Sequence, residues 1–556
     1  MSAGLVIRGG KVIDGTGAPA VRADVAIEDG RVVSIASKLE GERTLDASDH
    51  IVAPGFIDIH THYDAQVFWD PALSPSCFHG VTTVVAGNCG FSIAPTRVEH
   101  HEVIARTLEN VEDMNFDTLS AGIPWDFSTF AEYLGSVERR GVGMNFCAYI
   151  GHTAIRLFVM GAAAYERAAT TDEVEQMQDV VRDGMRAGAI GFATSFAPTH
   201  RGMDGKPIPS RFADRAELEA LLDVLLELDA GVVGVTPGEG CSIDDLYELQ
   251  LRTGRPFTYG AILTRPDGLH ADAVKLNDEG WRRGARVWPQ VTPRPLVLAN
   301  TMVRPYIFNM DAVFNELMTQ PLAARRAAYS DPVWREKAKT GLETTGFSGP
   351  FWSKVVIDGS RAHSDLVGRS LADLASERAV EPADVMLDLA LDESDLELRL
   401  SLILANDDTN EVGKLLRDEH CTLGLSDAGA HLGQLCDAAQ ATDFLGNWVR
   451  DRHLMPLEAA VRKLTGVQAD ILGFEDRGYL RPRAWADIVV FDPETVAPGP
   501  TRRVRDFPAG AERLTADAPV GVRHVLVNGV TVQEDGGRVN ADARPGHVLR
   551  NRLAGP

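Results

Sequence analysis

Two histidines separated by one residue end an apolar segment near the start of the chain. Residues 53–62 read APGFIDIHTH. Side chains on a β-strand alternate between its two faces, so His60 and His62 project to the same side. The apolar side chains, and the Pro54-Gly55 pair before them, favour a buried strand over two histidines in a surface turn. Two imidazoles on one side of a strand end predict a metal site.

Two further groups that bind metals follow other predicted strands. Cys89 follows the strand in TTVVAGNCGFS, and Asp427 follows the strand in LGLSDAGAH. Imidazoles, a thiolate and a carboxylate together suit zinc, so we predict that His60, His62, Cys89 and Asp427 are its ligands. Taken alone, Cys89 fits a small buried side chain equally well, and Asp427 fits a helix cap.

This set of ligands predicts hydrolysis. Zinc lowers the pKa of a bound water toward about 7 and polarises a carbonyl oxygen, so an amide can be attacked at neutral pH. We expect Asp427 to take the water's proton and pass it to the leaving nitrogen. His152, at the end of a third strand, is a candidate donor to the substrate carbonyl, although a packed histidine fits equally well. Candidates for binding a substrate carboxylate are Arg156, Arg201 and Arg294, although an arginine at a strand end more often pairs internally.

The elements that must position these groups follow a repeated strand–helix pattern. Eight strand-like segments separated by helices predict an α/β fold, a (β/α)₈ TIM-like barrel over residues 54–483, with catalytic groups at the carboxyl ends of the strands. Thr170-Thr171-Asp172-Glu173 has the spacing of a helix capping box. The section at about 300–360 interrupts the pattern, so we predict an insertion there on the loop face of the barrel.

Both ends of the chain show a pattern of short strands and turns in place of the strand–helix repeat. Residues 1–53 and 484–556 contain short β-like runs separated by turn residues, and Glu28-Asp29-Gly30 is a hairpin signal. We therefore predict one small composite β domain, a β-sandwich formed from both termini.

Composition narrows the class of partner. The 556 residues are 44% hydrophobic and 24% charged, as in globular enzymes, and carry a formal net charge of −24. Phosphate backbones and anionic membranes would be repelled, so we expect neither nucleic acid nor membrane as a partner. No leader and no apolar run of about 20 residues is present, which predicts a soluble, cytoplasmic protein. The sequence is compatible with a homo-oligomer. The six cysteines have no paired spacing and do not resemble a disulfide framework.

The layout resembles the amidohydrolase superfamily and, within it, the D-aminoacylase group of N-acyl-D-amino-acid deacylases. The resemblance covers nearly the whole chain and rests on APGFIDIHTHYD, GVTTVVAGNCGFSIAP, Gly151-His152, LGLSDAGAH and RGYLRPRAWADIVVFDP. Its most specific parts are the GNCG cysteine, where hydantoinases have a carboxylated lysine, and the SDAG aspartate. It implies zinc-dependent hydrolysis of a linear C–N amide bond in an N-acyl amino acid or another N-acyl amide.

The sequence departs from that family at two strands. The family has metal-binding histidines at the ends of the fifth and sixth strands, whereas here GVVGVTPGEG and RPFTYGAIL place Thr236 and Ala261 there. We therefore expect about one zinc per chain. Two alternatives remain: a hydantoinase-like cyclic amide hydrolase, although no lysine ends the fourth strand, and a noncatalytic ligand-binding relative, although the set His60, His62, Cys89 and Asp427 is complete.

Overall fold

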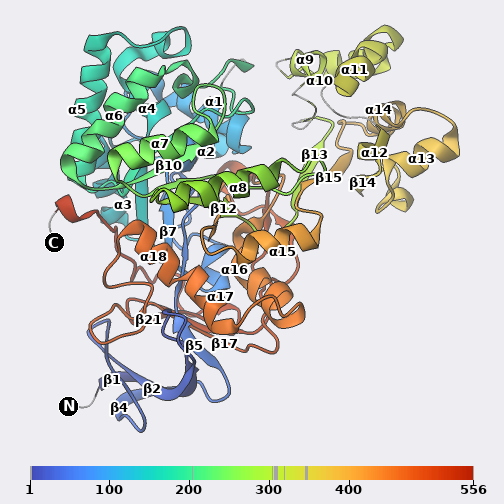
Figure 1. The fold of residues 1–556 in the computed structure, drawn as a ribbon. Coiled ribbons are helices and arrows are strands. Elements are labelled where there is room, and N and C mark those ends of the chain that lie inside the picture. Colours follow the sequence, from blue (N-terminus) through green and yellow to red (C-terminus); the bar gives the residue numbers. More distant parts are fainter. Residues whose placement is uncertain are drawn as a thin grey trace. The chain divides into compact units, whose positions relative to one another are not determined.

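Eight parallel strands form the sheet that carries the predicted site, in the computed structural model of the protein (Figure 1). In chain order they are β6 (Phe56–Asp58), β7 (Val81–Ala86), β8 (Asn145–Gly151), β9 (Gly191–Ser195), β10 (Val232–Thr236), β11 (Phe257–Tyr259), β12 (Val287–Val291) and β16 (Thr422–Leu423). Each strand pairs in parallel with the next one. Every residue of β7, β8 and β9 is buried, as expected for parallel strands covered on both faces.

The sheet closes just beyond its first and last strands. Thr61 and Ala428 form a parallel bridge, and the backbone N–H of His62 donates to the carbonyl oxygen of Ala428 at 2.8 Å. The Ser426 hydroxyl donates to the carbonyl oxygen of His60 at 2.8 Å. These contacts join the segments after β6 and β16, so the predicted TIM-like barrel is confirmed.

Helices connect the strands. They include α3 (Phe130–Arg140), α5 (Thr171–Ala187), α6 (Arg215–Leu228), α7 (Ile243–Thr253), α8 (Leu269–Arg282), α15 (Thr409–Arg417), α17 (Leu457–Leu464) and α18 (Gly466–Leu472). Helix α5 begins after Thr170, whose side chain accepts from the backbone N–H of Glu173 while the Glu173 side chain accepts from Thr170. The predicted capping box is thus confirmed. None of the helices that the structure describes is long and apolar enough to cross a bilayer.

Strands from both termini share a second, nine-stranded sheet. It contains β1 (Ala3–Val12), β2 (Val21–Glu28), β3 (Arg31–Ala36), β4 (Gly41–Asp46), β5 (Ile51–Pro54), β17 (Ile488–Phe491), β20 (Val522–Val527), β21 (Val530–Glu534) and β22 (Gly537–Arg538). Antiparallel pairing of β5 with β17 joins the two ends of the chain. Asp29 and Gly30, both at positive φ, turn β2 back onto β3 as the hairpin signal predicts. All of these strands lie in one sheet, so the sandwich form stays a prediction.

A separate compact unit is formed mainly by residues between β12 and β16. It comprises Pro295–Asp407 with Gly433–Leu435, and is longer than the predicted insertion at 300–360. It has its own three-stranded sheet, with β15 (Arg399–Ala405) between β13 (Leu296–Thr301) and β14 (Val355–Gly359), and its own hydrophobic core. The structure describes residues 3–202, 205–303, 305, 308, 311–318, 320–344 and 349–554, so parts of the predicted insertion lie outside the described residues.

Candidate metal centre

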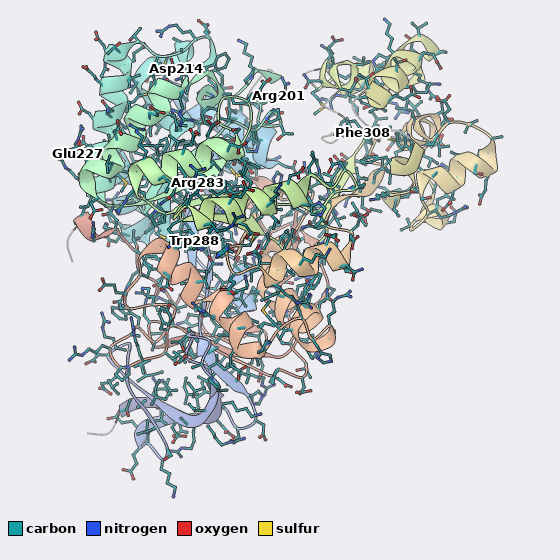
Figure 2. The ribbon with its side chains drawn as sticks, in the orientation of Figure 1. Arg201, Asp214, Glu227, Arg283, Trp288 and Phe308 are labelled. Carbon is teal, nitrogen blue, oxygen red and sulfur yellow. The ribbon has the colours of Figure 1, made fainter. Side chains whose placement is uncertain are left out.

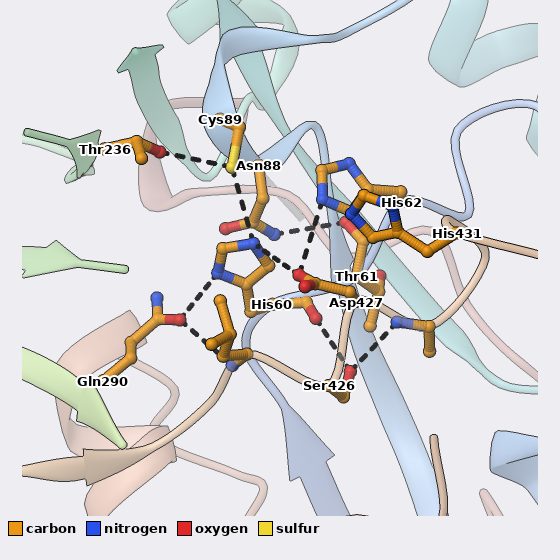
Figure 3. A network of polar contacts seen from close by, with 12 residues as sticks. His60, Thr61, His62, Asn88, Cys89, Thr236, Gln290, Ser426, Asp427 and His431 are labelled. Carbon is orange, nitrogen blue, oxygen red and sulfur yellow. Dashed lines mark hydrogen bonds and ion pairs between the residues drawn. The ribbon is translucent and has the colours of Figure 1, made fainter. Parts of the chain in front are cut away.

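The four predicted ligands meet at the mouth of the barrel (Figure 3). Ligand atoms of His60, His62 and Cys89 all lie within 4.8 Å of one another. Oδ1 of Asp427 lies 3.1 Å from Nε2 of His60 and 3.8 Å from Nε2 of His62. Sγ of Cys89 lies 3.6 Å from the same His60 nitrogen. The first, second and eighth strands therefore bring together the groups that their sequence positions predicted.

Tight turns after the strands aim two of these side chains. Cys89 has φ of 55° and Asp427 has φ of 46°, in the left-handed region that residues with a side chain rarely adopt. Such conformations cost of order 1–3 kcal/mol each and are found mainly where a site requires them. Positive φ also occurs in ordinary turns of this chain such as that at Asp29, so it describes how the turns at Cys89 and Asp427 are built and does not by itself mark a site.

His60 is held by an amide from the seventh strand. Nδ1 of His60 lies 2.6 Å from Oε1 of Gln290, and Nε2 of Gln290 donates to Oγ1 of Thr258 at 3.1 Å. Because the Gln290 oxygen is thus an acceptor, His60 carries its proton on Nδ1 and keeps Nε2 for a metal. Sequence reasoning missed Gln290, although a polar residue within the apolar strand VWPQV was an available signal.

His62 faces a carboxylate that sequence reasoning also missed. Glu112 ends helix α1 (His101–Glu112), and its Oε1 lies 3.7 Å from Nδ1 of His62. Its Oε2 lies 3.6 Å from Nε2 of His431. Burial raises the pKa of Glu112 to about 7, against the opposing effect of His431. In the sequence, Glu112 looked like any charged residue on the surface of an amphipathic helix.

The fifth and sixth strands contribute no histidine to the centre. Thr236, at the end of β10, donates from its hydroxyl to Sγ of Cys89 at 3.2 Å. Beyond β11, a Cβ atom on Gly260 would come within 3.3 Å of Cε1 of His60, so a side chain there would crowd the ring. His200, which follows β9, is held instead by Ser195, with Nδ1 2.7 Å from Oγ.

The electrostatics of the centre fit a cation. Burial raises the pKa of Asp427, but the hydrogen bond and charge of His60, with His431 and His62, outweigh it and hold the pKa well below its usual value. Burial opposes a charge on His60, yet Cys89 and Asp427 raise its pKa well above the usual value. Positive charge is therefore favoured where Nε2 of His60 meets the acidic groups. Two nitrogens, a sulfur and an oxygen at this place are ligands that zinc prefers.

His152 does not reach the centre. It is fully buried, with Nδ1 2.8 Å from Oγ1 of Thr194 and Nε2 2.9 Å from Oε1 of Glu217. Arg156 is buried beside it and pairs with the same Glu217 carboxylate. Since both ring nitrogens of His152 are engaged, this geometry does not support the expected catalytic role.

The three candidate arginines differ in their partners. Arg156 and Arg294 pair internally, with Glu217 and with Asp437 at 2.7 Å. Arg201, labelled in Figure 2, follows His200 directly and donates to the carbonyl oxygen of Gly205 at 2.9 Å. Arg211 donates to the carbonyl oxygen of Pro198, in the same loop after β9, at 3.2 Å. Burial and the charge of Arg201 lower the pKa of Arg211. The charge of Glu239 opposes this effect, so a carboxylate of the chain already lies within electrostatic reach of Arg211.

Comparison with known proteins agrees with this geometry. Residues 43–533 match the model of the amidohydrolase family. The chain belongs to this family. It is 29% identical to an N-acyl-D-glutamate deacylase of Alcaligenes xylosoxydans xylosoxydans, over 98% of this chain and 96% of that protein.

Two solved structures resemble this amidohydrolase over nearly its full length. One is an N-acyl-D-glutamate deacylase from Bordetella bronchiseptica in complex with zinc and a phosphonate inhibitor, with 28% identity, a TM-score of 0.70, and coverage of 99% and 100% of the two chains. The other is a D-aminoacylase with a binuclear metal centre, described as activated by one metal and attenuated by the second, with 25% identity, a TM-score of 0.67, and coverage of 98% and 99%. The amidohydrolase described here is accordingly a metal-dependent hydrolase of a linear, non-peptide C–N amide bond.

Proposed function

We propose that this amidohydrolase is a one-zinc deacylase of N-acyl amino acids. The observation that carries the proposal is the cluster of His60, His62 and Cys89, whose ligand atoms lie within 4.8 Å of one another, with Asp427 beside both histidines. The deacylase of Alcaligenes and the zinc-bound deacylase of Bordetella are both named for N-acyl-D-glutamate, which supports an N-acyl amino acid as substrate.

One zinc fits the available ligands better than two. His60 and His62 would hold it through Nε2, with Asp427 and the thiolate of Cys89 completing the shell. The fifth- and sixth-strand positions offer only the Thr236 hydroxyl, which donates to Cys89, and Ala261, whose methyl group cannot bind a metal. Two adjacent dications need more ligands than these residues supply.

The residues around the centre have different roles in hydrolysis. Bound zinc would supply Lewis acidity to the amide carbonyl and to a water. Asp427 receives the proton of the attacking water and returns it to the leaving nitrogen. Gln290 fixes the His60 ring through Nδ1, which keeps Nε2 directed at the centre. The Thr236 hydroxyl stabilises the Cys89 thiolate by a hydrogen bond.

The substrate carboxylate would bind at Arg211, with Arg201 beside it. Both belong to the segment after β9, at the strand ends where the metal ligands also lie. Two guanidinium groups close together repel one another, and Arg211 is half-buried. A bound carboxylate relieves this repulsion and accepts charge-assisted hydrogen bonds. Such a ligand favours an acyl amino acid over a neutral acyl amine.

A linear substrate is also favoured over a cyclic one by the fourth strand. Strand β9 reads GFATS and contains no lysine, so the lysine-bridged site of hydantoinase-like enzymes cannot form there. With its net charge of −24, we expect the protein to act on a small molecule and not on nucleic acid. A cytoplasmic location and a homo-oligomeric state stay predictions.

The test combines metal analysis with a substrate panel. Protein purified without chelators would be analysed by plasma emission, then assayed on D and L forms of several N-acyl amino acids and on neutral N-acyl amines. We expect about one zinc per chain, activity that a chelator removes and zinc restores, and a preference for the carboxylated substrates. Two tightly held metals would contradict the one-zinc proposal, and metal-free protein without activity would favour the noncatalytic alternative.

A further inference from the structure

A carboxylate occupies the buried face of helix α1 next to the metal centre. Ile104 and Leu108 lie on the same face, four residues apart, and Glu112 is the next residue in that series. The residue is only 2% exposed, as deeply buried as His62. An apolar residue would continue this face at lower cost, because a buried carboxylate costs several kcal/mol unless it is well partnered.

The partners of this carboxylate are two imidazoles. Among the described residues, the ion pairs of Glu112 are with His62 through Oε1 and with His431 through Oε2, and none is with a lysine or arginine. The carbonyl oxygen of Glu112 also accepts the backbone N–H of His431. Glu112 therefore contacts a metal ligand on one side and the loop that carries Asp427 on the other.

We propose that Glu112 is a positioning residue that sets the orientation of His62 and anchors the loop after Asp427. Nδ1 of His62 is buried without a hydrogen-bond partner among the described residues, and Oε1 of Glu112 lies 3.7 Å from it. Once that gap closes, the carboxylate accepts the Nδ1 proton, which fixes the tautomer and leaves Nε2 for the metal. Gln290 already holds His60 in this way, with its neutral amide oxygen 2.6 Å from Nδ1. A carboxylate acceptor in addition makes the imidazole a stronger ligand. This inference rests on the proposed function in that His62 is taken to bind zinc.

The second contact gives Glu112 a wider role. His431 and Asp427 both have positive φ, so the turn between them is a conformation that must be held from outside. Glu112 holds its far end through His431, while the His62 backbone holds Ala428 inside the turn. A single buried residue thus links the placement of a metal ligand to that of the general base. In a centre without fifth- and sixth-strand histidines, this link takes over part of the positioning.

The test measures zinc affinity and folding separately. Glu112→Gln keeps the shape of the side chain, and Glu102→Gln makes the same change at an exposed position on the same helix as the control. Zinc affinity would be measured by competition with a chromogenic chelator, and the stability of the zinc-free protein by denaturant unfolding. We expect Glu112→Gln to weaken zinc binding by roughly 10- to 100-fold, the usual effect of losing such a partner. The zinc-free variant should be as stable as the wild type or more so, because a buried charge is gone.

Several results would overturn the inference. Wild-type zinc affinity in Glu112→Gln would show that the carboxylate does not position His62. If Glu112→Gln lowers the free energy of zinc binding and the free energy of unfolding of the zinc-free protein by equal amounts, Glu112 has only a structural role. If Glu112→Gln fails to fold, Glu112→Asp keeps the charge and withdraws it by one methylene; wild-type zinc affinity in that variant would equally refute positioning. If the wild type itself binds no zinc, the proposed function is wrong. If the wild type binds zinc and the Glu112 variants bind it equally well, only the inference about Glu112 is wrong.

Discussion

Nε2 of His60 lies 3.1 Å from Oδ1 of Asp427, across the seam where the first and eighth strands of the barrel close. The same Asp427 oxygen lies 3.8 Å from Nε2 of His62. One carboxylate oxygen of Asp427 therefore lies close to Nε2 of both imidazoles. This arrangement suits a residue that both touches the metal site and acts as general base.

Asp427→Asn should reduce kcat by roughly 100-fold or more, because an amide keeps the shape of the side chain but cannot accept and return a proton at neutral pH. Steady-state assays with zinc in excess check this, and the zinc content of the variant is measured in parallel. If the variant binds zinc as the wild type does and still turns over at nearly the wild-type rate, another group is the base.

Much of this centre is predictable from the sequence because strand ends are recognisable there. His60, His62, Cys89 and Asp427 each follow an apolar run, and parallel strands of a barrel present their carboxyl ends on one face. Glu112 is not predictable in this way, because only packing in three dimensions tells a buried glutamate from its solvated neighbours on α1. His152 shows the converse error: like the proposed ligands it follows a strand, but its Nε2 lies 2.9 Å from Oε1 of Glu217.

Cys89→Ala should lower both zinc content and rate if the thiolate is a ligand, since coordination holds the sulfur deprotonated. Thr236→Val removes only the hydroxyl that donates to Sγ, so we expect it to weaken zinc binding less than Cys89→Ala does. Zinc titrations of the zinc-free Cys89→Ala and Thr236→Val proteins show which variant binds zinc more weakly. Full zinc occupancy and near-normal kinetics in Cys89→Ala would reduce the shell to His60, His62 and Asp427.

Glu217→Gln should destabilise the protein by about 3–5 kcal/mol at neutral pH, because it leaves the buried Arg156 without its charge partner. Burial alone would raise the pKa of Glu217, but His152 and Arg156 lower it to about 2. The stability that this carboxylate contributes is therefore present above its ordinary pKa of 4.5 and is lost as the pH falls toward about 2.

Unfolding by denaturant at about pH 7 and about pH 3 tests this pH dependence. The difference in free energy of unfolding between wild type and Glu217→Gln should be smaller at the lower pH. A difference that is constant or larger at low pH would contradict the assigned pKa shift. Zinc content per folded molecule should stay unchanged in this variant, since the network of Glu217, His152 and Arg156 contains none of the metal ligands.

Arg211→Gln separates recognition of the substrate carboxylate from catalysis. The comparison uses an N-acyl amino acid and its neutral primary amide. A lost hydrogen bond between charged groups costs about 1.5–3 kcal/mol, so KM for the acid should rise roughly 10- to 100-fold. The kcat/KM for the amide should hardly change, because the amide offers Arg211 no charge. Arg283→Gln, at an exposed position after α8, is the matched control and should alter neither substrate. Equal losses on acid and amide would mean that Arg211 supports the loop after β9, and an unchanged KM for the acid would place the carboxylate elsewhere.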